Sequence, residues 1–291
     1  MFWWMNMYND SWRKLKPEDL EIAYNPQKSV KNFADFQKHR NDASKKFRDI
    51  NNMHLDISYG SHDQKKVDIF LSEKNSPVHI FFHGGYWRTQ DKKNFAFVAE
   101  TLNKYRISVV IANYVLCPKH TLSQVVQSAR EVIIWTYNSI NKYSANNKNI
   151  SISGNSAGAH LCSMLISTDW KLYGLPNDCI KAATLISGIY DPEPTRWIKV
   201  NNEIGIDLDE ASLNNSMSLQ PFVKCPIWLG AGGREPWPWI DQTLDYSQYL
   251  RKNNFDPELH ILPKHNHFSI MDEIYKEDGI LSSAIVKNIE F

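Results

Sequence analysis

The spacing of hydrophobic residues changes near residue 55. Residues 1–54 carry a stripe close to helical spacing, and Ser29 is placed to cap that helix. The members of the stripe are Val30, Phe33, Phe36, Ala43, Phe47 and Ile50. We therefore expect a peripheral helical extension that either buttresses the core or covers a site. The aromatic cluster Phe2, Trp3 and Trp4 favours a flap, or an interface with a second copy in a homodimer.

Beyond residue 55, short β-rich runs alternate with longer amphipathic stretches. Residues Leu55–Tyr59 and the alternating residues Val67, Ile69 and Leu71 predict two antiparallel edge strands. Near-continuous apolar runs predict buried strands at 78–82, 107–112, 149–153, 182–187, 226–230 and 258–262. Helical patterns lie between them at about 92–104, 121–143, 157–168, 240–253 and 268–276. This alternation predicts a mostly parallel, doubly wound α/β sheet with helices on both faces.

Composition narrows the classes of protein that fit this pattern. The chain has 291 residues, 42% of them hydrophobic, which predicts one domain over 1–291. Residues 191–222 have three prolines and no strong period, so they are a candidate cap or substrate loop. A net charge of +1 without blocks of like charge argues against nucleic acid as a partner. No apolar run approaches the ~18 residues that cross a membrane.

No two of the four cysteines have the C-x-x-C spacing, and the N-terminus lacks the features of a signal peptide. The sequence therefore predicts reduced thiols and a cytoplasmic location.

A serine lies where a strand meets a helix. The predicted strand 149–153 runs into Gly154-Asn155-Ser156-Ala157-Gly158, and a helical pattern follows. This is the order of a nucleophile elbow, in which small residues two before and two after the serine let strand and helix approach closely. Ser156 is the candidate nucleophile.

A glycine-rich turn follows the predicted strand 78–82, in His83-Gly84-Gly85-Tyr86-Trp87. Backbone N–H groups of such a turn can bind the negative oxygen of a tetrahedral intermediate. We expect an oxyanion hole formed by Gly84, Gly85 and Tyr86 together with the N–H of Ala157.

The candidate base and acid lie near the C-terminus. The last predicted strand leads into His265-Asn266-His267, of which His267 is the expected base and His265 the alternative. Glu235 follows the strand near 226–230 and is the expected acid, with Asp241 as its rival at a helix start. The order nucleophile, acid, histidine is that of α/β-hydrolases. H-x-H offers only two metal ligands and no convincing third, so we expect no metal and no cofactor.

Several segments resemble the arylformamidase (kynurenine formamidase) and esterase branch of the α/β-hydrolases. They are HGGYWRTQDKKNFAF, NYVLCP, SISGNSAGAHL, TDW, SGIYDPEP and HNHFSIMDE. The resemblance implies metal-free hydrolysis of N-formylkynurenine or of small esters, with Ser156, Glu235 and His267 as the triad. The chain departs from the branch at Asn155, at Glu235 in place of Asp, and at Pro238-Trp239, which puts the identity of the substrate in question.

Aromatic residues near these motifs are candidate contacts for an aryl substrate: Tyr86, Trp87, Tyr190, Trp197, Trp237 and Trp239. His160 fits the AGxH pattern of the branch and is expected to have a structural role. The resulting hypothesis is a serine hydrolase of a small aryl formamide. The alternatives are a carboxylesterase for short acyl or aryl esters and a non-catalytic binding protein of the same fold.

Overall fold

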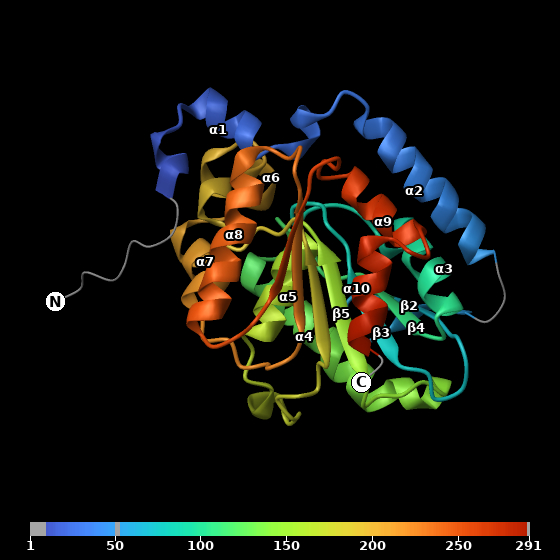
Figure 1. The fold of residues 1–291 in the computed structure, drawn as a ribbon. Helices are drawn as coiled ribbons and strands as arrows, with labels where there is room; N and C mark the ends of the chain where they lie inside the picture. Colours follow the sequence, from blue (N-terminus) through green and yellow to red (C-terminus); the bar gives the residue numbers. More distant parts are fainter. Residues whose placement is uncertain (1–9, 50–52, 290–291) are drawn as a thin grey trace.

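The computed structural model describes residues 10–49 and 53–289. Eight strands form one sheet in the order β1-β2-β4-β3-β5-β6-β7-β8 (Figure 1). Their bounds are Met53–Ser58, Lys66–Phe70, Val78–Phe82, Ser108–Ala112, Ile150–Asn155, Ala182–Ile186, Ile227–Gly232 and Glu258–Leu262 for β1 to β8. Pairing is antiparallel from β1 to β2 and from β2 to β4, and parallel across the rest of the sheet. The predicted mostly parallel sheet is confirmed. The prediction of two edge strands is correct only for β1, because β2 lies between β1 and β4.

The central strands are buried on both faces, which explains their near-continuous apolar sequence. Along β3, Ile80 and Phe82 belong to one hydrophobic core while Phe81 belongs to the other. Successive side chains of a strand point to opposite faces, so the sheet separates two cores. Helices on both faces therefore have an apolar surface to cover.

Each core is closed by its own helices. Helices α4 (Leu122–Ser139), α5 (Ala157–Ile166) and α8 (Trp237–Lys252) contribute to the core that contains Ile80. Helices α3 (Phe97–Lys104), α9 (Asp272–Tyr275) and α10 (Ile280–Ile289) contribute to the other. Helix α10 was not among the predicted elements. Short 3-10 helices occur at η1 (Asp10–Lys14), η3 (Lys92–Asn94), η4 (Ile140–Tyr143), η5 (Trp170–Tyr173) and η8 (Ser269–Met271).

The N-terminal extension contains α1 (Pro17–Ala23), η2 (Pro26–Ser29) and α2 (Phe33–Arg48). The prediction that Ser29 caps the long helix is wrong. The Ser29 hydroxyl donates to the carbonyl of Pro26 within η2, and α2 begins only at Phe33, with Asn32 in the N-cap position. Four residues of the expected helix and aromatic cluster lie outside the described residues: Phe2, Trp3, Trp4 and Ile50.

Helix α2 reaches from the core to the carboxyl edge of the sheet. At its C-terminal end the Phe47 ring packs on Phe70, with 5.3 Å between ring centroids. At its N-terminal end the rings of Phe33 and Phe36 pack on Phe268, at 4.9 and 5.9 Å. One end of the helix therefore packs on the core, and the other lies beside the candidate base.

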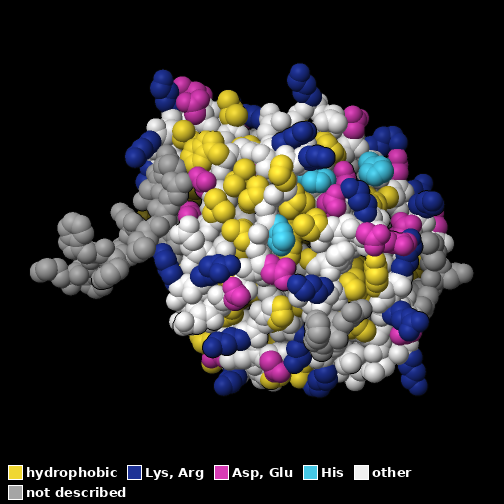
Figure 2. Space-filling model, in the orientation of Figure 1, with side chains coloured by type: hydrophobic (Ala, Val, Ile, Leu, Met, Phe, Trp, Pro, Cys, Tyr) yellow, Lys and Arg dark blue, Asp and Glu magenta, His cyan; other side chains and the backbone are white. Residues whose placement is uncertain are grey.

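Residues 191–222 form short helices: η6 (Glu193–Trp197), α6 (Asn201–Ile204), α7 (Leu208–Leu213) and η7 (Ser216–Ser218). They lie near α1 and α8 in Figure 1. Acidic and basic side chains are interspersed over the face shown in Figure 2, as expected of a chain with almost equal numbers of each. Among the helices of residues 10–49 and 53–289, none has the length and hydropathy needed to span a bilayer.

Candidate active site

Ser156 occupies a sharp turn between β5 and α5. Its backbone has φ 59° and ψ −119°, a strained conformation for a residue with a side chain, and its N–H donates to the carbonyl of Ile186 at 2.8 Å. The flanking glycines are sterically required. A Cβ on Gly154 would lie 2.2 Å from the carbonyl carbon of Gly158, and a Cβ on Gly158 would lie 1.9 Å from the carbonyl oxygen of Phe82. The predicted strand, turn and helix are therefore present around Ser156.

His267 and Glu235 meet at the carboxyl ends of β8 and β7. His267 Nδ1 lies 2.6 Å from Glu235 Oε2. The other oxygen, Oε1, accepts from the Ser187 hydroxyl at 2.5 Å and from the Gly232 N–H at 2.6 Å. A carboxylate only accepts hydrogen bonds, so Nδ1 carries a proton, and in the neutral imidazole the lone pair is then on Nε2. This is the tautomer that a general base requires.

The rival residues lie elsewhere. His265 Nδ1 lies 2.9 Å from the carbonyl oxygen of Ser269, and its Nε2 lies 3.2 Å from Glu273 Oε1. Asp241 is part of helix α8. The carboxylate that contacts His267 is Glu235.

Aromatic rings enclose the imidazole of His267. Its centroid lies 4.3 Å from the ring of Trp239 and 5.4 Å from that of Phe268. The residue is 2% exposed. Packing on two sides restricts rotation of the imidazole and keeps bulk water away from the contact with Glu235.

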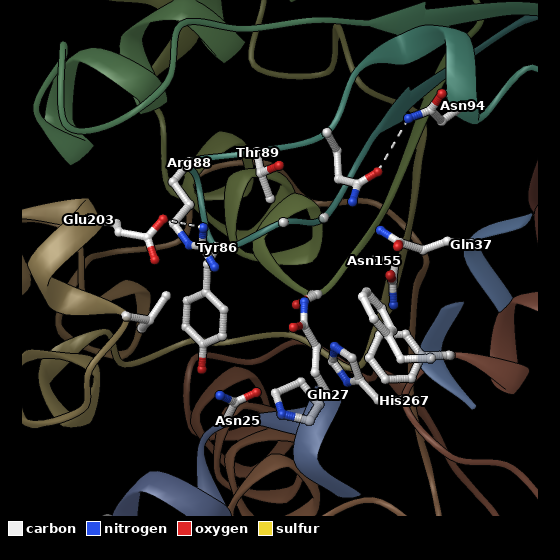
Figure 3. Close-up of a pocket in the computed structure, with 18 of the residues that line it drawn as sticks. Asn25, Gln27, Gln37, Tyr86, Arg88, Thr89, Asn94, Asn155, Glu203 and His267 are labelled. Carbon is white, nitrogen blue, oxygen red and sulfur yellow. Dashed lines mark hydrogen bonds and ion pairs between the residues drawn. The ribbon is translucent and has the colours of Figure 1, made fainter. Parts of the chain in front are cut away.

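A cavity of about 190 Å³ opens at this edge of the sheet, and both Ser156 and His267 line it. Figure 3 shows His267, Asn155 and Gln37 on one side of the cavity, with Tyr86 and Arg88 on the other. Side chains of the N-terminal extension contribute to its wall together with the loop that follows β3. A small molecule in this cavity would contact the candidate nucleophile and base together.

The loop after β3 has an unusual backbone. Gly85, Tyr86 and Trp87 have φ values of 115°, 51° and 54°. Gly84 approaches the elbow so closely that a Cβ there would lie 3.2 Å from the Cβ of Ser156. Within the described part of the chain, no backbone carbonyl accepts from the N–H of Gly85 or Tyr86.

Ala157 is the first residue of α5, where helical N–H groups have no partner within the helix. The residues expected to form an oxyanion hole therefore lie around Ser156, and their backbone N–H groups can donate to a bound oxygen.

The chain is similar to known hydrolases in sequence and in fold. The BD-FAE family model matches residues 67–183. The chain is 28% identical to a kynurenine formamidase from Danio rerio over 96% of this chain and 98% of that protein. Among solved structures, it is similar to a putative thioesterase from Silicibacter sp. TM1040, with a TM-score of 0.81, 22% identity and coverage of 94% of this chain and 99% of that one. It is also similar to an esterase from Pyrobaculum calidifontis, with a TM-score of 0.69, 16% identity and coverage of 95% and 98%. The chain is a hydrolase of the α/β-hydrolase fold.

In this α/β-hydrolase, Tyr86 lines the cavity, whereas the other five aromatic residues expected to contact substrate do not. Trp87, Tyr190 and Trp239 are buried in packing, while Trp197 and Trp237 are 59% and 41% exposed. Closeness in sequence to a catalytic motif does not determine the direction of a side chain. The aromatic residues that line the cavity are Phe33, Tyr86, Phe95 and Phe268.

His160 links two parts of the α/β-hydrolase that are distant in sequence. Its Nδ1 accepts from the indole N–H of Trp87 at 3.1 Å, and its Nε2 lies 2.8 Å from the carbonyl oxygen of Asn214. Burial lowers the pKa of His160 to about 4, so the ring is neutral near pH 7. The expected structural role agrees with these contacts, which tie the loop after β3 to the segment 191–222.

Two further histidines of the α/β-hydrolase are buried and uncharged. Burial lowers the pKa of His79 to about 3, and its ring lies between the hydroxyls of Ser151 and Ser153. Burial also lowers the pKa of His83 to about 4.

Sequence reasoning assigned no role in the site to three residues that contact or line it. Ser187, in the left-handed region at φ 51°, donates to Glu235. Asn155 and Arg40 line the cavity. Asn155 had a signal in its place beside Ser156, and Ser187 in its place at the start of the segment SGIYDPEP. Arg40 had none, because it reaches the site through packing of a segment that is distant along the chain.

Proposed function

We propose that this α/β-hydrolase cleaves a small aryl formamide with Ser156, His267 and Glu235 as its catalytic triad. The observation that carries the proposal is the 2.6 Å contact between His267 and Glu235 beside a cavity that both Ser156 and His267 line. The similarity to a kynurenine formamidase over nearly the whole chain supports a formamide as the substrate.

In the proposed acylation step, His267 Nε2 takes the proton of the Ser156 hydroxyl as its oxygen attacks the formyl carbon. The carbonyl oxygen becomes negative and is stabilised by the N–H groups of Gly85 or Tyr86 and of Ala157. Glu235 stays ionised and stabilises the imidazolium. His267 then gives its proton to the leaving aryl amine, and the C–N bond breaks.

In the proposed deacylation step, His267 activates a water molecule that attacks the formyl ester of Ser156. The second tetrahedral intermediate uses the same N–H donors. Formate leaves, and the proton on His267 returns to the Ser156 oxygen. The chemistry of these residues requires no cofactor.

A carboxylesterase for short acyl or aryl esters is the second candidate. The names of similar structures favour it, since one is an esterase and another a putative thioesterase. The same triad can cleave either bond, because only the leaving group differs.

Hydrolysis of N-formylkynurenine, formanilide and 4-nitrophenyl acetate by the purified protein tests the two candidates. We expect the largest kcat/KM for a formamide, and a larger value for the acetate would favour the esterase. The variant Ser156→Ala should lose activity on all three, whereas Ser283→Ala, on the exposed side of α10, should keep it. A fluorophosphonate probe should label Ser156 in the unchanged protein. Activity of Ser156→Ala equal to that of the unchanged protein would overturn the proposed nucleophile.

A further inference from the structure

One cation of the cavity wall comes from the N-terminal extension. Helix α2 contributes Phe33, Gln37, Arg40 and Asn41 to the wall. These positions are spaced by four, three and one residues and so share one face of the helix. Arg40 is the member of this group that carries a charge.

The guanidinium of Arg40 is only partly satisfied by the protein. Its Nη2 donates to the carbonyl oxygen of Phe268 at 2.6 Å. Among the described residues, none forms a hydrogen bond with its buried Nε. Across residues 10–49 and 53–289, no carboxylate oxygen lies within 4.0 Å of this guanidinium, and Asp272 attracts it only from farther away. An arginine stays protonated even when burial lowers its pKa, so a positive charge remains at the wall.

Of the other charged side chains on the cavity wall, Arg88 and both acids have partners, and Lys199 is exposed to solvent. Arg88 Nη1 lies 2.5 Å from Glu203 Oε2. Glu21 Oε1 lies 2.9 Å from Lys28 Nζ. Both acids of the cavity wall are thus occupied by cations, and neither balances Arg40.

Arg40 is half-buried, with its Nε fully shielded from solvent. A charge partly removed from water without an anionic partner is unfavourable, and a bound anion would compensate it. The planar guanidinium offers several N–H donors in a fork that matches the two oxygens of a carboxylate. Phe268, whose carbonyl holds Arg40, directly follows His267 in the chain, so such an anion would lie near the reacting groups.

We propose that Arg40 is a specificity-determining residue that binds a carboxylate of the substrate, so that the preferred substrates are acidic. This inference rests on the proposed function in one respect, namely that the reaction takes place in this cavity. The carboxylate and the formyl group would then be separate parts of one small molecule.

Binding without turnover tests the inference. Isothermal titration calorimetry on Ser156→Ala protein compares N-formylkynurenine with the analogue whose carboxylate is a neutral carboxamide. We expect the carboxylate compound to bind at least about tenfold more tightly, the range for a hydrogen bond to a charged group. In the Arg40→Gln background this preference should fall below about threefold, and Arg40→Lys should keep part of it.

The matched control is Lys45→Gln, which removes one positive charge from an exposed position of the same helix. Lys45→Gln should leave the preference for the carboxylate compound unchanged. This result would distinguish binding by Arg40 from an effect of the protein's overall charge. Equal affinity of the Ser156→Ala protein for both compounds would overturn the inference, as would a preference that survives in a folded Arg40→Gln protein. Failure of the proposed nucleophile would show instead as hydrolysis by Ser156→Ala during the titration.

Discussion

Replacing Glu235 by glutamine tests how the carboxylate controls His267. Oε1 of Glu235 accepts from both the Ser187 hydroxyl and the Gly232 N–H, so this position must remain an oxygen in the variant. The new side-chain NH₂ group of Glu235→Gln would then replace Oε2 and face Nδ1, which lies 2.6 Å from Oε2 in the unchanged protein. Two donors cannot share a hydrogen bond, so the imidazole would shift its proton to Nε2 and lose the lone pair that accepts from Ser156.

The expected loss is large because both the tautomer and the charge are wrong. We expect kcat of Glu235→Gln to fall by roughly 10³–10⁴, or about 4–5.5 kcal/mol of transition-state stabilisation. Steady-state hydrolysis of the best formamide from the substrate screen measures it, and the thermal midpoint shows whether the variant folds. Asp241→Asn is the matched control, with an expected change in kcat of less than about twofold, since the carboxylate that contacts His267 is Glu235.

Two results would contradict the role assigned to Glu235. If folded Glu235→Gln protein keeps kcat within about tenfold of the unchanged protein, Glu235 does not control the tautomer of His267. If Asp241→Asn loses activity and Glu235→Gln does not, the acid has been assigned to the wrong residue.

Three further predictions concern the elbow, the loop after β3 and the buried histidines. Gly158→Ala should lower the free energy of unfolding by roughly 3 kcal/mol or more, since its Cβ would lie 1.9 Å from a backbone oxygen; a normal urea midpoint would refute the close approach. Trp87→Phe removes the indole N–H that His160 accepts, and kcat should fall roughly tenfold with little change in KM; an unchanged kcat would show that this bond does not position the loop. Burial lowers the pKa values of His83 and His160 to about 4 in the folded protein. Between about pH 6.5 and 4 the unfolded chain therefore binds protons at these histidines that the folded protein does not bind. The free energy of unfolding should then fall with falling pH, by up to about 1.4 kcal/mol per pH unit for each histidine. Urea titrations from pH 7 to 5 measure this slope, and His160→Gln should reduce it; the same slope in that variant would contradict a neutral buried His160.

The sequence by itself determined the sheet and the elbow. Strands buried on both faces need continuous apolar runs, and these runs located β3 to β8 within a few residues. The steric requirement for Gly154 and Gly158 is local, so the spacing around Ser156 was sufficient to predict the turn. Helix α10 was missed although its apolar positions are buried. The start of α2 was misplaced because the Ser29 hydroxyl donates within η2 and does not cap the long helix.

Only the tertiary structure decided which distant residues surround the cavity. The choice between Glu235 and Asp241, and between His265 and His267, depends on how the loops after β7 and β8 pack together. Of the aromatic residues near the motifs, Tyr86 lines the cavity and the other five are packed or exposed outside its wall, while Arg40 reaches the wall from a helix far away in sequence. The physical reason is that a side chain's direction follows from the packing of the whole fold, which hydrophobic periodicity along one segment does not contain.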